Sequence, residues 1–147
     1  MTANPMQRYA AGFAAGFVAT LVFHQGILEL LNGIGFTESS TFPGRPTAPL
    51  GVPAIWSLAF WGGVWGLIFV GVERWFPRAA GYWAAAIVFG ALLPSLVAWF
   101  VVFPLKGMPA AGGFEISALG TGLAVNGAWG LGTGLFLMAF AGPRSSA

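Results

Sequence analysis

The sequence predicts an all-α fold, a polytopic membrane four-helix bundle assembled from two tandem helical hairpins that repeat in parallel. Three observations carry this prediction. Only 7% of the 147 residues are charged and 57% are hydrophobic, whereas a soluble domain carries about 25% charged residues. The few charges leave four long uncharged runs, and the pattern Gly-x-Trp-Gly-Leu occurs twice along the chain. The composition alone therefore indicates a membrane protein.

The four uncharged runs define the expected spans. Each run is about as long as the ~20 residues that a helix needs to cross the hydrocarbon core. The runs are continuously apolar, which favours helices over the alternating strands of a barrel. The first run is followed by "HQGILELLNGIGF" and by no small-residue cleavage pattern, so we interpret it as a retained span. We expect one membrane domain over residues 1–147, with spans near 9–31, 52–72, 82–103 and 116–141.

The basic residues of the connections predict the orientation, because cytoplasmic connections carry an excess of Lys and Arg. Four basic residues fall on one side of the predicted membrane and two on the other. The first group is Arg8, Arg74, Arg78 and Arg144, and the second is Arg45 and Lys106. This distribution predicts that both termini are cytoplasmic.

The repeated phrase indicates an internal duplication. "GVWGL" at 63–67 returns as "GAWGL" at 127–131. The aligned pairs include Trp65 with Trp129, Gly66 with Gly130 and, for the first and third spans, Gly16 with Gly90. We interpret segments 9–72 and 82–141 as repeats related by a pseudo-twofold axis along the membrane normal. Chance is the alternative, since Gly, Trp and Leu are common in this chain.

Small residues spaced four apart indicate close helix packing, because they let backbones approach each other in lipid. In the fourth span the pattern extends into a stripe of Gly122, Asn126, Gly130 and Gly134 on one face. We expect the second and fourth spans to be central. The candidate packing residues are Gly62, Gly66, Trp65, Gly130, Gly134 and Trp129.

Polar residues gather at the end of the first span, in "HQGILELLN". Gln25, Glu29 and Asn32 follow an i, i+4, i+7 spacing and share one helix face, with His24 at its margin. A charge near the hydrocarbon is costly unless it is paired or hydrated. Lys106, expected on the same side, is the candidate counter-charge for Glu29. The alternative is that both side chains reach the headgroups separately.

A candidate polar cluster or ligand-binding site follows from these positions. Asn126 lies deeper in the fourth span, and we expect it to donate to a carbonyl of a neighbouring helix. We expect Pro94 to kink the third span, and Ser57 and Thr121 to bond back to their own helices. The candidate site residues are His24, Gln25, Glu29, Asn32, Lys106 and Asn126.

The loop "TFPGRPTAPLGVP" between the first two spans is rich in Pro and Gly. We expect it to be extended over the outer mouth of the helices. Two interpretations remain open at this point: a lid over a polar vestibule, or a stiff connector.

The residue inventory limits the chemistry. The chain has no Cys, and one His with four acidic residues cannot supply an ordinary three-ligand zinc site. Haem ligation by His24 and a Met, or by two copies of His24, has no motif behind it. "GLGTG" lies inside the fourth span without a preceding strand, so a nucleotide-binding loop is not indicated. We expect no metal, no cofactor, no nucleic-acid partner and no enzymatic activity.

At "HQG", "PLGVPAIWSLAFWGGVWGL", "VAWFVVFPLKG" and "NGAWGLGT" the chain resembles small four-helix inner-membrane proteins of proteobacteria. The resemblance implies a multi-pass protein of the bacterial inner membrane and carries no known activity. We expect a non-enzymatic structural or accessory membrane protein. The alternative is a small oligomeric transporter or channel with a polar site in the outer leaflet. The expected partners are the lipid bilayer and either further copies of the chain or a larger membrane complex.

Overall fold

A computed structural model describes residues 4–143 of the chain, which leaves Arg144 outside the described residues. Four helices in this part are long and apolar enough to cross a membrane: Pro5–Gly33, Ala54–Trp75, Ala80–Leu105 and Ile116–Ala141. The predicted all-helical fold with four spans is thus confirmed, and the chain has the character of a multi-pass membrane protein.

Two of the four spans are interrupted by a π-helical turn, and a third ends in a 3-10 turn. The first consists of α1 (Pro5–Ala19), a π-helical turn η1 (Thr20–His24) and α2 (Gln25–Gly33). The second is α3 (Ala54–Val72), followed by the 3-10 turn η2 (Glu73–Trp75). The third is α4 (Ala80–Val97), a π-helical turn η3 (Ala98–Val102) and α5 (Phe103–Leu105). A 3-10 segment η4 (Ala110–Phe114) then leads into the continuous α6 (Ile116–Ala141).

Two local features differ from expectation. α1 begins at Pro5, ahead of the predicted start at Tyr9, because Asn4 caps the helix through the backbone N–H of Gln7 at 2.8 Å. Pro5 occupies the first turn, where its missing N–H costs nothing. The third span continues through Pro94 as regular helix and widens into its π-helical turn only at Ala98.

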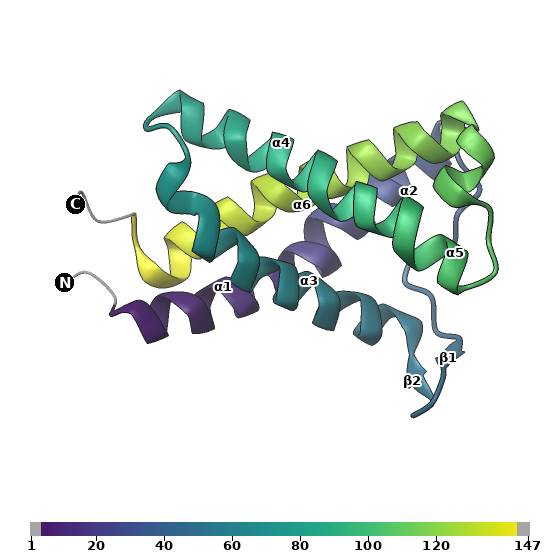
Figure 1. The fold of residues 1–147 in the computed structure, drawn as a ribbon, viewed down its shortest axis with the longest axis horizontal. Coiled ribbons are helices and arrows are strands. Elements are labelled where there is room, and N and C mark those ends of the chain that lie inside the picture. The colour runs from purple at the N-terminus through teal and green to yellow at the C-terminus, as the bar shows by residue number, and fades with distance from the viewer. Residues whose placement is uncertain (1–3, 144–147) are drawn as a thin grey trace.

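The helix backbones meet one another in the order α3, α1, α6 and α4. α3 packs on α1, α1 packs on α6, and α6 packs on α4. α1 and α6 are therefore the central pair, and the expectation that the second and fourth spans are central is wrong for the second. Figure 1 shows the two described chain ends on one side together with the connection from α3 to α4. We call this side the terminal end and the opposite side the loop end.

Glycine sets the closest contacts within each hairpin. A Cβ added to Gly66 would collide with the carbonyl oxygen of Gly12 in α1, and one added to Gly130 would collide with the carbonyl oxygen of Ala86 in α4. Gly16 faces Gly62 and Gly66, and Gly90 faces Asn126 and Gly130. These contacts use the same positions of the two aligned segments. Backbones can approach this closely only where side chains are absent.

The stripe predicted on α6 is its contact face toward α4. All four of its members meet α4 or the π-helical turn that follows it. Gly122 meets Trp99, Asn126 meets Ser95, Gly130 meets Gly90, and Gly134 meets Tyr82 and Trp83.

The two tryptophans of the repeated phrase each reach into the other hairpin. Trp129 is 3% exposed and donates its indole N–H to the carbonyl of Gly16, at 3.0 Å. Trp65 is half-buried and packs edge-on against Phe89 of α4, with ring centroids 6.3 Å apart. A buried indole N–H needs an acceptor, and the Gly16 carbonyl supplies it at the α1–α6 contact.

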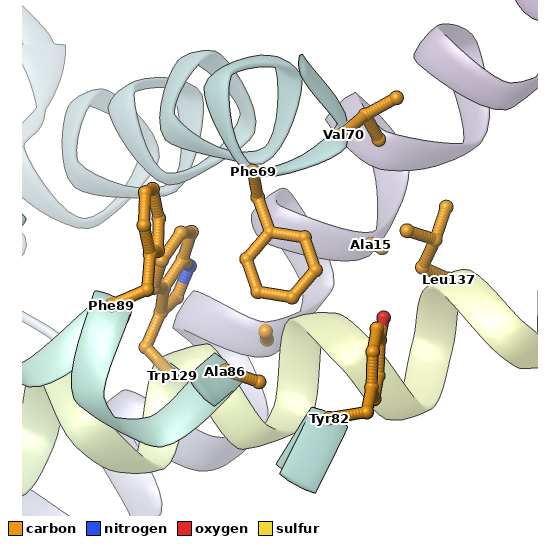
Figure 2. Close-up of a cluster of buried hydrophobic side chains, with 9 residues drawn as sticks. Ala15, Phe69, Val70, Tyr82, Ala86, Phe89, Trp129 and Leu137 are labelled. Atoms are coloured by element: carbon orange, nitrogen blue, oxygen red, sulfur yellow. The ribbon is translucent and has the colours of Figure 1, made fainter. Parts of the chain in front are cut away.

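An aromatic cluster fills the space between the hairpins toward the terminal end. Phe69 is fully buried and projects from α3 between Phe89, Tyr82 and Ala15 (Figure 2). Its ring lies 5.5 Å from that of Phe89 and 6.4 Å from that of Tyr82, both nearly perpendicular. Edge-to-face pairs of this kind are favourable beyond their burial. α3 and α4 are thus joined by side chains, without the backbone approach seen between α1 and α6.

The glycine contacts make a direct prediction for stability. Gly66→Ala should destabilise the protein by about 1–3 kcal/mol, because the new methyl group meets the backbone of Gly12 and the helices must separate. Thermal unfolding in mild detergent measures the effect. Gly26→Ala is the matched control, since Gly26 is also helical and a Cβ there has nothing within 4 Å. Equal melting of the two variants would remove the packing role assigned to Gly66.

Candidate functional site

The predicted polar face of the first span anchors the loop that follows it. Gln25, Glu29 and Asn32 lie on α2 and each bonds to segment 39–42 after the chain has turned back. The bonds are Phe42 N–H to Gln25 Oε1 at 2.7 Å, Thr41 hydroxyl to Glu29 Oε2 at 2.8 Å, and Asn32 Nδ2 to the Ser39 carbonyl at 2.8 Å. The i, i+4, i+7 spacing thus places three side chains where they meet the returning segment at Phe42, Thr41 and Ser39.

Gln25 is the most buried of these side chains, at 1% exposed. Its Oε1 must face the Phe42 N–H, so its Nε2 faces Nδ1 of His24 at 3.1 Å. An amide nitrogen can only donate, and His24 Nδ1 therefore accepts, which places the proton of a neutral imidazole on Nε2. His24 is joined to the loop through Gln25, and the two lie at the junction of η1 and α2.

Asn126 belongs to a separate group within the α4–α6 contact. Its Nδ2 donates to the hydroxyl of Ser95 at 3.0 Å, and that hydroxyl donates to the Gly122 carbonyl at 3.2 Å. Ser95 is fully buried. Asn126 bonds to a neighbouring helix as expected, with a hydroxyl in place of the expected carbonyl.

Lys106 stands apart from the other candidates. It is exposed at the end of α5, and across residues 4–143 no ion pair joins it to Glu29. Glu29 is itself exposed and accepts from Thr41 instead. The six candidates thus divide into a loop-anchoring group with His24, Asn126 inside the α4–α6 contact, and the exposed Lys106.

The hydroxyl of Thr121 corrects a further expectation. Its buried Oγ1 has no hydrogen-bond partner within the described chain, so it does not bond back to its own helix. Oδ1 of Asn32 is likewise buried and without a partner there. A buried polar atom without a partner costs free energy.

A polar cluster that sequence reasoning missed lies at the terminal end. Arg8 of α1 and Glu73 of η2 form a bidentate ion pair, with Nε to Oε1 at 2.5 Å and Nη2 to Oε2 at 3.0 Å. Tyr82 of α4 donates to Glu73 at 3.3 Å, and Arg8 also donates to the Gly142 carbonyl after α6, at 3.1 Å. Glu73 is 2% exposed. The cluster therefore joins the ends of all four spans.

One signal in the sequence pointed toward this pair. Arg8 stands just before the first uncharged run and Glu73 just after the second, so an antiparallel hairpin brings them to the same end. The prediction of orientation used Arg8 only as a basic residue of the N-terminus and did not consider an ion pair with Glu73.

The Pro-rich loop forms a small hairpin rather than a cover. β1 (Pro46–Thr47) pairs antiparallel with β2 (Val52–Pro53), directly before α3. Figure 1 shows the hairpin beyond the loop end of α3 and away from α4 and α6. The loop is thus attached at two places, at α2 through segment 39–42 and at α3 through the hairpin.

Comparisons of the chain with protein-family models, with curated proteins and with solved structures found no match. Among residues 4–143, no group of three or more His, Asp and Glu side chains could hold a metal ion.

The ion pair at the terminal end gives the first prediction for these sites. Glu73→Gln should destabilise the protein by about 3 kcal/mol, because it leaves the Arg8 guanidinium partly buried without its carboxylate. Chemical unfolding in detergent measures the loss. Arg74→Gln is the control, since exposed Arg74 stacks on Trp75, 4.1 Å from the ring centroid, outside the cluster. A loss no larger than that of the control would contradict the anchoring role.

The bonds between α2 and segment 39–42 give a second prediction. Gln25→Leu should speed hydrogen exchange of the Phe42 amide by about tenfold, which corresponds to one lost hydrogen bond of ~1.4 kcal/mol. Hydrogen-exchange mass spectrometry of the 37–47 segment measures it. Asn126→Leu removes a polar side chain elsewhere and should leave this segment unchanged. Unaltered exchange in Gln25→Leu would show that the loop is held by other contacts.

Proposed function

We propose that this chain is a non-enzymatic structural or accessory protein of the bacterial inner membrane. The observation that carries the proposal is the use made of its polar side chains. Gln25, Glu29 and Asn32 bond to the chain's own loop, and Asn126 bonds to Ser95. Polar residues within membrane spans commonly mark ligand or ion pathways. Here their bonds hold the fold together, as a scaffold requires.

The way the spans are fastened supports the same role. Backbone contacts at glycine join the helices of each hairpin, the Trp129–Gly16 bond joins α6 to α1, and the Arg8–Glu73 pair closes the terminal end. A protein that presents a surface to a partner gains from such rigidity, because less conformational freedom is lost on binding.

We further propose that the chain is a four-helix bundle of two duplicated hairpins. Support comes from the matched glycine contacts, Gly16 with Gly66 and Gly90 with Gly130, which occupy aligned positions of the two segments. The duplication would relate the hairpins by a twofold axis along the membrane normal.

The proposed orientation has both termini in the cytoplasm. The basic residues of the connections support it, since Arg8, Arg74 and Arg78 lie toward the terminal end, against Arg45 and Lys106 toward the loop end. A reporter fused after Arg78 should report a cytoplasmic location, and an external location would reverse the proposal.

A small transporter or channel is the second candidate, favoured by an asymmetry between the hairpins. α1 packs along α6, whereas α3 and α4, the equivalent pair under the duplication, meet through aromatic rings. During alternating access, the α1–α6 and α3–α4 contacts would swap their geometries, so that each in turn is the closer one.

One experiment separates the two functions. The chain is purified at native abundance in mild detergent, and the pure protein is also placed in liposomes under an ion or proton gradient. We expect a stable complex with a distinct membrane protein and no flux above that of protein-free liposomes. A homo-oligomer alone, with flux that falls in Asn126→Leu and persists in the lipid-facing variant Leu135→Ala, would overturn the accessory function and support transport.

A further inference from the structure

We propose that the β1–β2 hairpin is a membrane-interface anchor, whose tip inserts into the boundary between headgroups and acyl chains beside α3. The tip consists of the apolar sequence Ala48-Pro49-Leu50, with Leu50 84% exposed. The occupant of this surface is the lipid bilayer. This inference is independent of whether the chain acts as an accessory protein or as a transporter.

The hairpin is held in a fixed shape by its own hydrogen bonds. The Gly51 N–H donates to the Thr47 carbonyl at 2.7 Å, and the Thr47 hydroxyl donates to the Val52 carbonyl at 2.7 Å. At its base, the Ala54 N–H donates to the Arg45 carbonyl at 2.9 Å. These hydrogen bonds fix the backbone of the turn. The exposed position of Leu50 is therefore set by the shape of the hairpin.

The depth of the tip follows from its short distance to α3 along the chain. Leu50 precedes Ala54, the first residue of the span, by four residues, which cover at most ~14 Å when fully extended. The turn folds this segment back, and in Figure 1 the hairpin runs sideways from the start of α3. The headgroup layer is about 5–8 Å thick on each side. The tip thus lies at the level of the membrane surface and beyond the edge of the helices.

The surface around the hairpin continues the lipid-facing side of α3. Trp56, in the first turn of α3, and Phe60, one turn further, are each 50% exposed. Exposed tryptophan near the end of a span sits at the level of the headgroups. No charged residue occurs between Pro46 and Val72, whereas Arg45 at the base is exposed and can meet lipid phosphate. An apolar tip with a basic base matches the chemistry of a lipid surface.

The experiment uses the absence of cysteine from the chain. Leu50→Cys provides a single thiol for an environment-sensitive fluorophore, and the labelled full-length protein is reconstituted into phosphatidylcholine–phosphatidylglycerol vesicles. Quenching is measured with lipids brominated near the headgroup and with aqueous iodide on both sides. We expect blue-shifted emission, strong quenching by the shallow brominated lipid and weak quenching by iodide.

Two further variants serve as controls for depth. Glu38→Cys, on the exposed part of the same loop, should be quenched by iodide, and Phe60→Cys, on the lipid-facing side of α3, by more deeply brominated lipid. Lipid quenching at position 50 should exceed that at position 38 by about twofold or more. Iodide quenching at position 50 equal to that at position 38 would overturn the proposal. Protection from both quenchers would also overturn it and would assign the tip to a contact with a second copy.

Discussion

Contact between helix backbones at glycine is the constraint on which the arrangement of this protein depends. Lipid is as apolar as a leucine side chain, so helices in a membrane gain little from burying apolar surface and depend on close packing. In the α1–α3 contact, Gly12, Gly16, Gly62 and Gly66 bring the backbones together, and Gly90 with Gly130 does the same for α4 and α6. The fully buried apolar positions of α1 are alanines, Ala15 and Ala19.

The contact between the two helical hairpins, where α1 meets α6, depends instead on a hydrogen bond to a buried polar group. Trp129 is buried at this contact, and its indole N–H requires an acceptor. The Gly16 carbonyl supplies it, so the residue whose missing side chain lets α3 approach α1 also accepts the bond from α6. Substitution of Gly16 would thus disturb two interfaces at once. One glycine couples packing within a hairpin to docking between hairpins.

Much of this architecture follows from the sequence, and the rest does not for identifiable reasons. Charge-free length predicted the four spans, and the spacing of glycine predicted a packing face on α6 without indicating that its partner is α4. Which span is central was not predictable, because α3 is apolar on all sides and lipid-facing residues do not differ in type from packed ones. The Arg8–Glu73 pair joins residues 65 positions apart, and a counter-charge was predicted only for Glu29, in Lys106. The polar face of α2 was visible as a periodicity, but its partners, the carbonyl, hydroxyl and N–H of segment 39–42, are groups that every loop carries.

The two ends of the molecule are therefore held by forces of different strength. A bidentate ion pair with a buried carboxylate closes the terminal end, and breaking such a pair is more costly than breaking neutral hydrogen bonds. At the loop end, neutral amides and one exposed carboxylate hold segment 39–42. Local opening starts where the contacts are weakest. Conformational freedom in this protein should therefore be concentrated in the loop between α2 and the β1–β2 hairpin. A hairpin anchored in the lipid surface would limit that freedom from its far side, so the membrane would supply the restraint that the loop's own hydrogen bonds leave incomplete.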